Sequence, residues 1–120
     1  GSSYDREKGA LMVSSGIEFA NYDRAMEEIM AQLAAIQRGD WEDWELAGAK
    51  SYLLNNFRSM EDSAASLESF VLFHAVSGSK ETLPELMEAV QAVTPERIMA
   101  AAKAVRPDTI YFLKGKETQE

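Results

Sequence analysis

The chain offers few side chains that could do chemistry, because it has one histidine and no cysteine. His74 follows Phe70 by four residues and Val71 by three, so all three fall on the apolar side of a predicted helix. A zinc ligand needs partner ligands at a fixed spacing, and the sequence offers none around His74. We therefore interpret His74 as a structural histidine of the core.

Three clusters of carboxylates are the next candidates: Glu27-Glu28, Glu42-Asp43-Glu45 and Glu61-Asp62. Paired carboxylates can transfer protons or bind cations, but none of these clusters has the spacing of a calcium loop. Acids at the start of a helix are already stabilised by the helix dipole. The stretch Gly78-Ser79-Lys80 is too short for a phosphate loop and suits a helix end. The sequence therefore predicts no catalytic residue and no metal or cofactor site.

Trp41 and Trp44 flank an acidic turn in which no apolar stripe calls for two large rings. They could cover the core beside Leu46. They could also anchor a neighbouring domain or partner, since tryptophan is enriched at the centres of protein interfaces. Both interpretations stay open at the level of sequence.

The net charge of the chain disfavours two classes of binding partner. Twenty acidic residues against 12 basic ones give a formal net charge of −8, which repels a phosphate backbone and an anionic membrane surface. No apolar run approaches the roughly 20 residues that span a bilayer. We expect no nucleic acid and no membrane partner, and the lack of cysteine fits a cytoplasmic location.

The ends of the chain differ in character from the rest. Gly1-Ser2-Ser3 has the composition of the scar left by a cleaved expression tag. Residues 4–115 read as a single domain or as part of one, and residues 116–120 form a polar tail. No internal repeat or low-complexity stretch divides the sequence.

Five helices follow from apolar spacing and from end signals. Asn21 precedes the first helix and Gly39 ends it, while Asp62-Ser63 precedes the third. Thr82 with Glu85 matches a capping box, and Thr94-Pro95 starts the last helix. The third helix is apolar nearly all round, which predicts that it lies at the centre of the core, with Val71 buried.

Strands are predicted at both ends of this helical series, at Ala10–Glu18 and Thr109–Leu113. Gly16 suggests a bulge in the first strand. The order strand, five helices, strand predicts an α+β, two-layer fold with the helices packed on one face of a small sheet. Two strands make a marginal sheet, so the chain reads as part of something larger.

At this point the sequence resembles the C-terminal homology domain of the pitrilysin/insulinase-type zinc peptidases, which include the mitochondrial processing peptidase. The resemblance runs from about Gly9 to Gly115 and depends on the order of several short segments. These segments are Gly9–Val13, Gly39, Glu45-Leu46, Ala49-Lys50, Asp62-Ser63, Val93–Ile98 and Asp108–Gly115. Glu42 departs from the pattern, because the family usually has Ser or Thr before the second helix.

The resemblance implies a zinc-dependent parent protein whose metal is held by an H-x-x-E-H motif in another domain. This chain lacks that motif, so the resemblance predicts that it is inactive alone and needs no cofactor. The family's substrate-holding Arg and Tyr would lie upstream of Gly1, and Tyr4 and Arg6 are not given that role. The implied task is to shape the peptide chamber and to pack against the metal-bearing domain.

Two alternatives remain at this level: an inactive peptidase homologue that serves as a structural or partner subunit, and an unrelated helical interaction module. The implied partners are the rest of its own polypeptide or a homologous subunit, with a peptide as the substrate of the parent. Because two strands leave open edges, we also expect the isolated fragment to form a homodimer.

Overall fold

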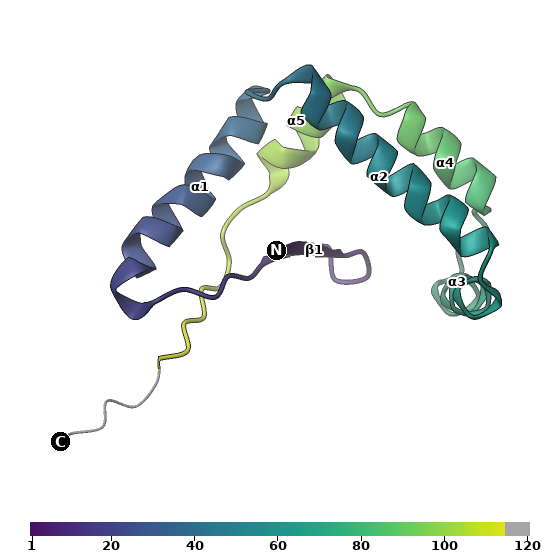
Figure 1. Cartoon of the computed structure of the whole chain (residues 1–120), viewed down its shortest axis with the longest axis horizontal. Helices are drawn as coiled ribbons and strands as arrows, with labels where there is room; N and C mark the ends of the chain where they lie inside the picture. The colour runs from purple at the N-terminus through teal and green to yellow at the C-terminus, as the bar shows by residue number, and fades with distance from the viewer. Residues whose placement is uncertain (115–120) are drawn as a thin grey trace.

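The computed structural model describes residues 1–114 and contains a hairpin followed by five helices (Figure 1). The hairpin consists of β1 (Ser2–Asp5) and β2 (Ala10–Val13), and a short 3-10 helix, η1 (Phe19–Asn21), follows it. The helices are α1 (Tyr22–Arg38), α2 (Asp43–Glu61), α3 (Ala64–Ser77), α4 (Leu83–Gln91) and α5 (Pro95–Ala104). The predicted α+β class and all five helices are confirmed.

The strands differ from the prediction in two ways. Residues 109–113 are not a strand, and the predicted strand Ala10–Glu18 ends at Val13. The partner of β2 is instead β1, which pairs with it in antiparallel register from Ser2 opposite Val13 to Asp5 opposite Ala10. Gly16, where we expected a bulge, lies outside the strand in open space.

The turn between β1 and β2 explains this pairing. The Asp5 carboxylate accepts hydrogen bonds from the backbone N–H groups of Glu7 and Lys8, both at 3.0 Å, and Gly9 supplies a left-handed φ of 62°. A local turn of this kind joins neighbouring strands at a small entropic cost, whereas Thr109–Leu113 would have to pair with a strand about a hundred residues away. Whether Gly1–Ser3 derive from a tag stays a prediction.

One half of the helical part is the pair α1 and α5. Ala102 of α5 is buried at 8% exposure, and the Gln37 side-chain amide donates to its carbonyl oxygen at 3.1 Å. Gly39 ends α1 with φ 79°, and an added Cβ there would lie 2.7 Å from the Met99 sulfur of α5. The left-handed backbone and the close approach of Met99 therefore both favour glycine at this position.

The other half is formed by α2, α3 and α4. The Lys50 ammonium of α2 donates to the carbonyl oxygens of Gln91, at 3.0 Å, and Val93, so it binds the C-terminal end of α4. Thr82 and Glu85 form the predicted capping box at the start of α4. Leu83, next to that cap, is the largest buried apolar residue described, at 6% exposure.

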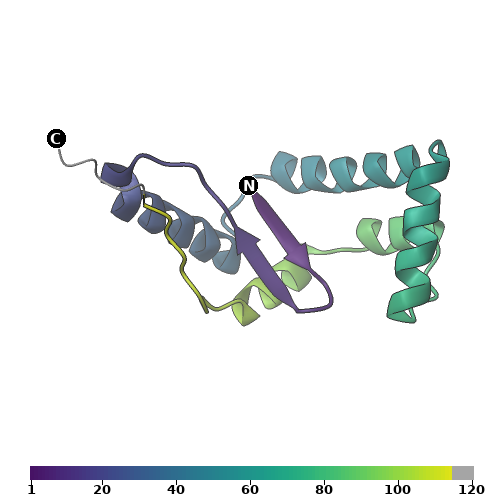
Figure 2. The ribbon, with the colours of Figure 1, turned by 90° about the horizontal axis from the view of Figure 1, so that it is seen from below.

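These two halves make an open arch rather than a closed globule, with the hairpin lying across its opening (Figures 1 and 2). The radius of gyration is 18.1 Å, whereas a compact chain of this length has about 14 Å. The hairpin touches the far half through an ion pair at 3.4 Å between Arg6 and Glu81, both about half exposed. An exposed ion pair of this kind contributes little stability.

Candidate functional site

The helix α3 carries the most distinctive surface of the described residues. Its start is fixed by Ser63, whose hydroxyl accepts a hydrogen bond from the Ser66 N–H at 3.3 Å, and its end by Gly78 with φ 72°. The prediction that α3 forms the centre of the core is wrong within this chain. We define the α3 outer face as Leu72, Phe73 and Val76, whose exposed fractions range from 40% to 76%. Val71, which is 63% exposed, lies at the rim of the groove described next.

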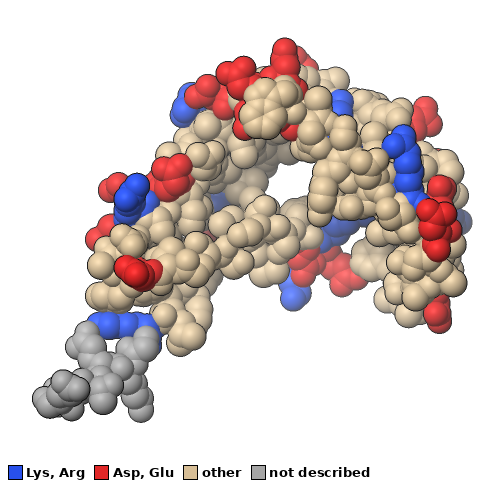
Figure 3. Space-filling model, in the orientation of Figure 1, with Lys and Arg blue, Asp and Glu red and all other residues tan. Residues whose placement is uncertain are grey.

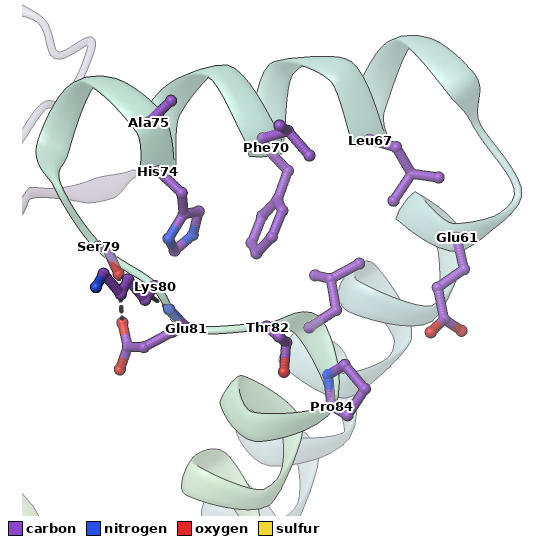
Figure 4. A pocket seen from close by; sticks show the side chains of 12 residues that line it. Glu61, Leu67, Phe70, His74, Ala75, Ser79, Lys80, Glu81, Thr82 and Pro84 are labelled. Atoms are coloured by element: carbon purple, nitrogen blue, oxygen red, sulfur yellow. Dashed lines mark hydrogen bonds between the residues drawn. The ribbon is translucent and has the colours of Figure 1, made fainter.

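The opposite side of α3 forms a groove with the start of α4, here called the α3–α4 groove (Figure 4). The groove is open, has a volume of about 680 Å³ and combines an apolar floor with polar ends. Ser79 and Glu81 lie at one end, where the Ser79 hydroxyl donates to the Glu81 carboxylate at 3.2 Å. Its lining residues are Glu61, Leu67, Phe70, Val71, His74, Ala75, Ser79, Lys80, Glu81, Thr82, Leu83 and Pro84.

His74 lies inside this groove at 7% exposure, as the sequence predicted for a core histidine. Its ring packs against Phe70 with centroids 4.1 Å apart and against Phe73 in an edge-on arrangement at 5.6 Å. The Nδ1 atom is buried and has no hydrogen-bond partner among the described residues. The ring of His74 is therefore held by packing against two aromatic neighbours of its own helix rather than by a hydrogen bond at Nδ1.

His74 does not fit a zinc site. Within residues 1–114, no three His, Asp or Glu side chains lie close enough together to hold a metal ion. The neighbours of the imidazole are aromatic and aliphatic carbons, which do not coordinate zinc. The zinc that the resemblance implies for the parent protein therefore has no ligand set in the described part of this chain.

The acidic clusters serve the helix ends and surfaces. The Glu45 carboxylate accepts a hydrogen bond from the Glu42 N–H at 2.8 Å, so these two residues form the start of α2. The Glu28 carboxylate accepts from the Gln32 amide at 2.9 Å, one turn along α1. Figure 3 shows acidic side chains gathered over the corner between α1 and α2. These contacts give Glu28, Glu42 and Glu45 a local, structural role.

Trp41 and Trp44 lie at the same corner but differ in exposure. Trp41 is half-buried, whereas Trp44 is 72% exposed and protrudes from the first turn of α2. The exposed ring of Trp44 is available to a neighbouring domain, and a role in such a contact stays a prediction. That Trp41 covers part of the core beside Leu46 likewise stays a prediction.

Sequence reasoning missed two features of the surface. One is the exposure of the α3 outer face, because an all-apolar helix gives no sign of which side is covered. The other is the segment 106–113, which ends in four apolar residues but pairs with no strand in the described chain. The run Ile110-Tyr111-Phe112-Leu113 predicted a strand and therefore a neighbouring strand to pair with. It did not indicate that no such neighbour lies within the described residues.

Comparison with known proteins gives one informative similarity. The chain is 34% identical over 110 residues to the probable inactive metalloprotease YmfF of Bacillus subtilis, and the match covers 92% of this chain. The chain is metalloprotease-like in sequence. It spans about a quarter of that relative, 26% of its length. No protein-family profile matches the chain, and no solved structure matches it significantly.

None of the helices within residues 1–114 is both long and apolar enough to cross a bilayer.

Proposed function

We propose that this chain is a non-catalytic segment of a pitrilysin/insulinase-type peptidase-like protein. There it shapes the peptide chamber and packs against the metal-bearing domain, or against a homologous subunit that carries that domain. The similarity to part of a metalloprotease-like relative and the order of the quoted segments support this proposal. We place the assembled protein in the cytoplasm, which the absence of cysteine favours.

The observation that carries the proposal is the α3 outer face. Leu72 and Val76 are 62% and 76% exposed, although each would gain about 1.5–3 kcal/mol if its side chain were fully buried. An apolar patch of this kind on one helix is typical of a surface that another protein segment covers. A relative of which the matched 110 residues are only 26% has the length of chain that such a cover needs.

A second candidate function is favoured by the relative itself, which is described as a probable inactive metalloprotease. In that case the parent of this chain is a peptidase homologue without catalysis, and the same surfaces serve a structural or partner role. The sequence upstream of Gly1 in the natural gene separates the two candidates. An H-x-x-E-H motif there, with zinc-dependent peptide cleavage by the full protein, supports the first candidate, and a disrupted motif supports the second.

The packing role is tested by expressing this chain and the remainder of its natural polypeptide as two separate pieces and measuring their association. The variant Val76→Glu should weaken association by at least about 30-fold, because it removes about 2 kcal/mol of apolar burial and adds a charge. The control Ser51→Glu adds the same charge at an exposed position of α2 and should leave association unchanged.

Both variants should leave the melting temperature of the isolated chain nearly unchanged, because both positions are exposed. Equal binding by Val76→Glu and by the wild type would show that α3 is not the covered surface. No association between the unmodified pieces would remove the packing role altogether.

A further inference from the structure

The C-terminal arm, which we define as residues 106–113, is an extended segment with little to hold it. No backbone hydrogen bond joins it to the rest of the described chain, and Ile110, Tyr111 and Leu113 are 59%, 82% and 78% exposed. Its anchor is Phe112, whose ring lies 4.5 Å from that of Tyr22 and 5.8 Å from that of Phe19, between centroids. The arm therefore presents three apolar side chains and a row of open backbone groups.

The hairpin presents a complementary edge. Gly1 and Ser14 exchange two hydrogen bonds, of 2.8 and 2.9 Å, and bonded and non-bonded pairs alternate along an antiparallel ladder. The N–H and C=O groups of Leu11 and Val13 consequently point away from β1, toward the outer edge of β2. The strand Ala10–Val13 has no charge and no proline, the two common shields of an exposed edge.

The arm and the chain that follows β2 also approach the same part of the structure, the short helix η1. The chain after β2 and the arm run toward the same end of the molecule (Figure 2). Near the end of the arm, Phe112 stacks on Phe19 of η1. The two segments thus run in the same direction along one side of the molecule, as they would in a parallel strand pair. Within one copy they stay unpaired, because the arm begins at the end of α5, which packs against α1 rather than against the hairpin.

We infer that the partner of this arm is a second copy of the same chain, and that two copies exchange arms about a two-fold axis. Each arm adds to the outer edge of β2 in the other copy, and its Phe112 takes the same place against Phe19 and Tyr22 there. The aromatic contact that each copy gives up is regained, and edge hydrogen bonds are added, which is the usual basis of a low-cost exchange dimer. This inference does not rest on the proposed function.

The available surface is sufficient for such a dimer. The chain exposes 9923 Å², whereas a compact chain of 13.3 kDa exposes about 6,500 Å². A stable interface buries about 1,600 Å² in total over both partners, which is less than the roughly 3,400 Å² of surplus on each copy. This surplus belongs to the whole chain, so it is an upper bound on the area that two arm junctions can bury.

The first test is the concentration dependence of the molar mass, measured by light scattering after size exclusion. The wild type should pass from monomer to dimer at tens of micromolar, which corresponds to a weak specific interface. The variant Leu11→Pro removes an N–H on the outer edge of β2 and spares the hydrogen bonds to β1, because proline suits an edge position. It should weaken dimerisation at least about tenfold relative to Leu11→Ala, which loses the side chain but keeps the N–H.

The second test stands even if Leu11→Pro disturbs the hairpin. Because the chain has no cysteine, Val13→Cys and Ile110→Cys can be made in separate copies of distinct mass, mixed and oxidised. Arm exchange predicts mainly the mixed disulfide. Disulfides between two Val13→Cys copies would show that β2 edges pair with each other, which overturns the inference.

An intramolecular disulfide in a monomer carrying both substitutions would show that the arm pairs within its own copy, and it would equally overturn the inference. The same holds for a wild type that stays monomeric up to a few hundred micromolar. If this chain and the remainder of its natural polypeptide fail to associate while the arm-exchange dimer still forms, the packing role fails and the inference about the arm stands.

Discussion

Gly39 gives the sharpest test of how the arch is held, since it ends α1 where α5 crosses it. The Gly39 N–H donates to the carbonyl oxygen of Ile36 at 3.1 Å and the Asp40 N–H to that of Ala35 at 3.0 Å. This pair of bonds is the Schellman motif, and it requires the left-handed φ of 79° that Gly39 adopts. The variant Gly39→Ala places a Cβ on this backbone.

Two costs add in Gly39→Ala. An L-residue in the left-handed region costs about 1–2 kcal/mol. The new Cβ would lie 2.7 Å from the Met99 sulfur, and moving that half-buried side chain off its rotamer costs about 0.5–1.5 kcal/mol more. We expect a loss of about 2–3 kcal/mol in the free energy of unfolding. For a chain of 120 residues this lowers Tm by about 8–12 °C.

Circular dichroism during urea and thermal unfolding measures this loss, and two other glycines provide matched controls. Gly78 has φ 72° with nothing within 4 Å of an added Cβ, so Gly78→Ala should carry the backbone cost alone. Gly48 lies in the middle of α2 with open space around it, so Gly48→Ala should raise stability by about 0.5–1 kcal/mol.

Equal losses for Gly39→Ala and Gly78→Ala would show that the contact with Met99 contributes nothing. Wild-type stability for Gly39→Ala would refute the whole argument about this helix end.

Three further predictions concern α3 and α4. Val71→Asp should change the free energy of unfolding by no more than about 0.5 kcal/mol because Val71 is 63% exposed, whereas Leu83→Ala should cost about 2 kcal/mol or more; urea melts compare them. The Thr82 N–H, and next its hydroxyl, hold the pKa of Glu85 below its usual range. This stabilisation is present above the ordinary carboxyl pKa and is lost as pH falls through the lowered one, so Glu85→Gln should flatten the acid side of a pH series of melts. Elemental analysis of the purified chain should find no stoichiometric zinc, since His74 has no companion ligands, and one tightly bound zinc per chain would contradict this.

The helices could be predicted from the sequence because their end signals are local. Thr82 with Glu85 and Thr94 with Pro95 each act within one turn, and the structure places helix starts at both. His74 was predicted to be buried for a similar reason, since Phe70 lies one turn before it on the same side of α3. These signals act within one helical turn and do not depend on how the rest of the chain folds.

The strands could not be predicted as well, because pairing depends on segments that are distant in sequence or on a turn that is easily overlooked. Thr109–Leu113 has strong β propensity, yet it has no partner strand within the described residues. Ser2–Asp5 has weak propensity, yet the Asp5 side chain and Gly9 build a turn that brings it against β2. Local turn chemistry here outweighed intrinsic propensity.

The error about α3 has a different physical origin. An all-apolar helix predicts burial, but the sequence does not say whether the covering surface belongs to the same chain. In this arch the covering surface is missing from residues 1–114, so Val71 and Val76 remain exposed. The same holds for Trp44, whose sequence context left both interpretations open and whose ring lies largely in solvent.

The two surfaces on which our proposals depend are separate, and this makes the proposals independent of one another. The α3 outer face lies at one end of the arch, whereas the arm and the aromatic cluster around Phe19 lie at the other (Figures 1 and 2). A dimer formed by exchanged arms therefore leaves α3 available to the rest of a longer protein. Val76→Glu should weaken only the association with the remainder of the polypeptide. Leu11→Pro should weaken only the dimer formed by exchanged arms. If either variant impaired both, the arch would have to transmit a change between halves that share no buried core within residues 1–114.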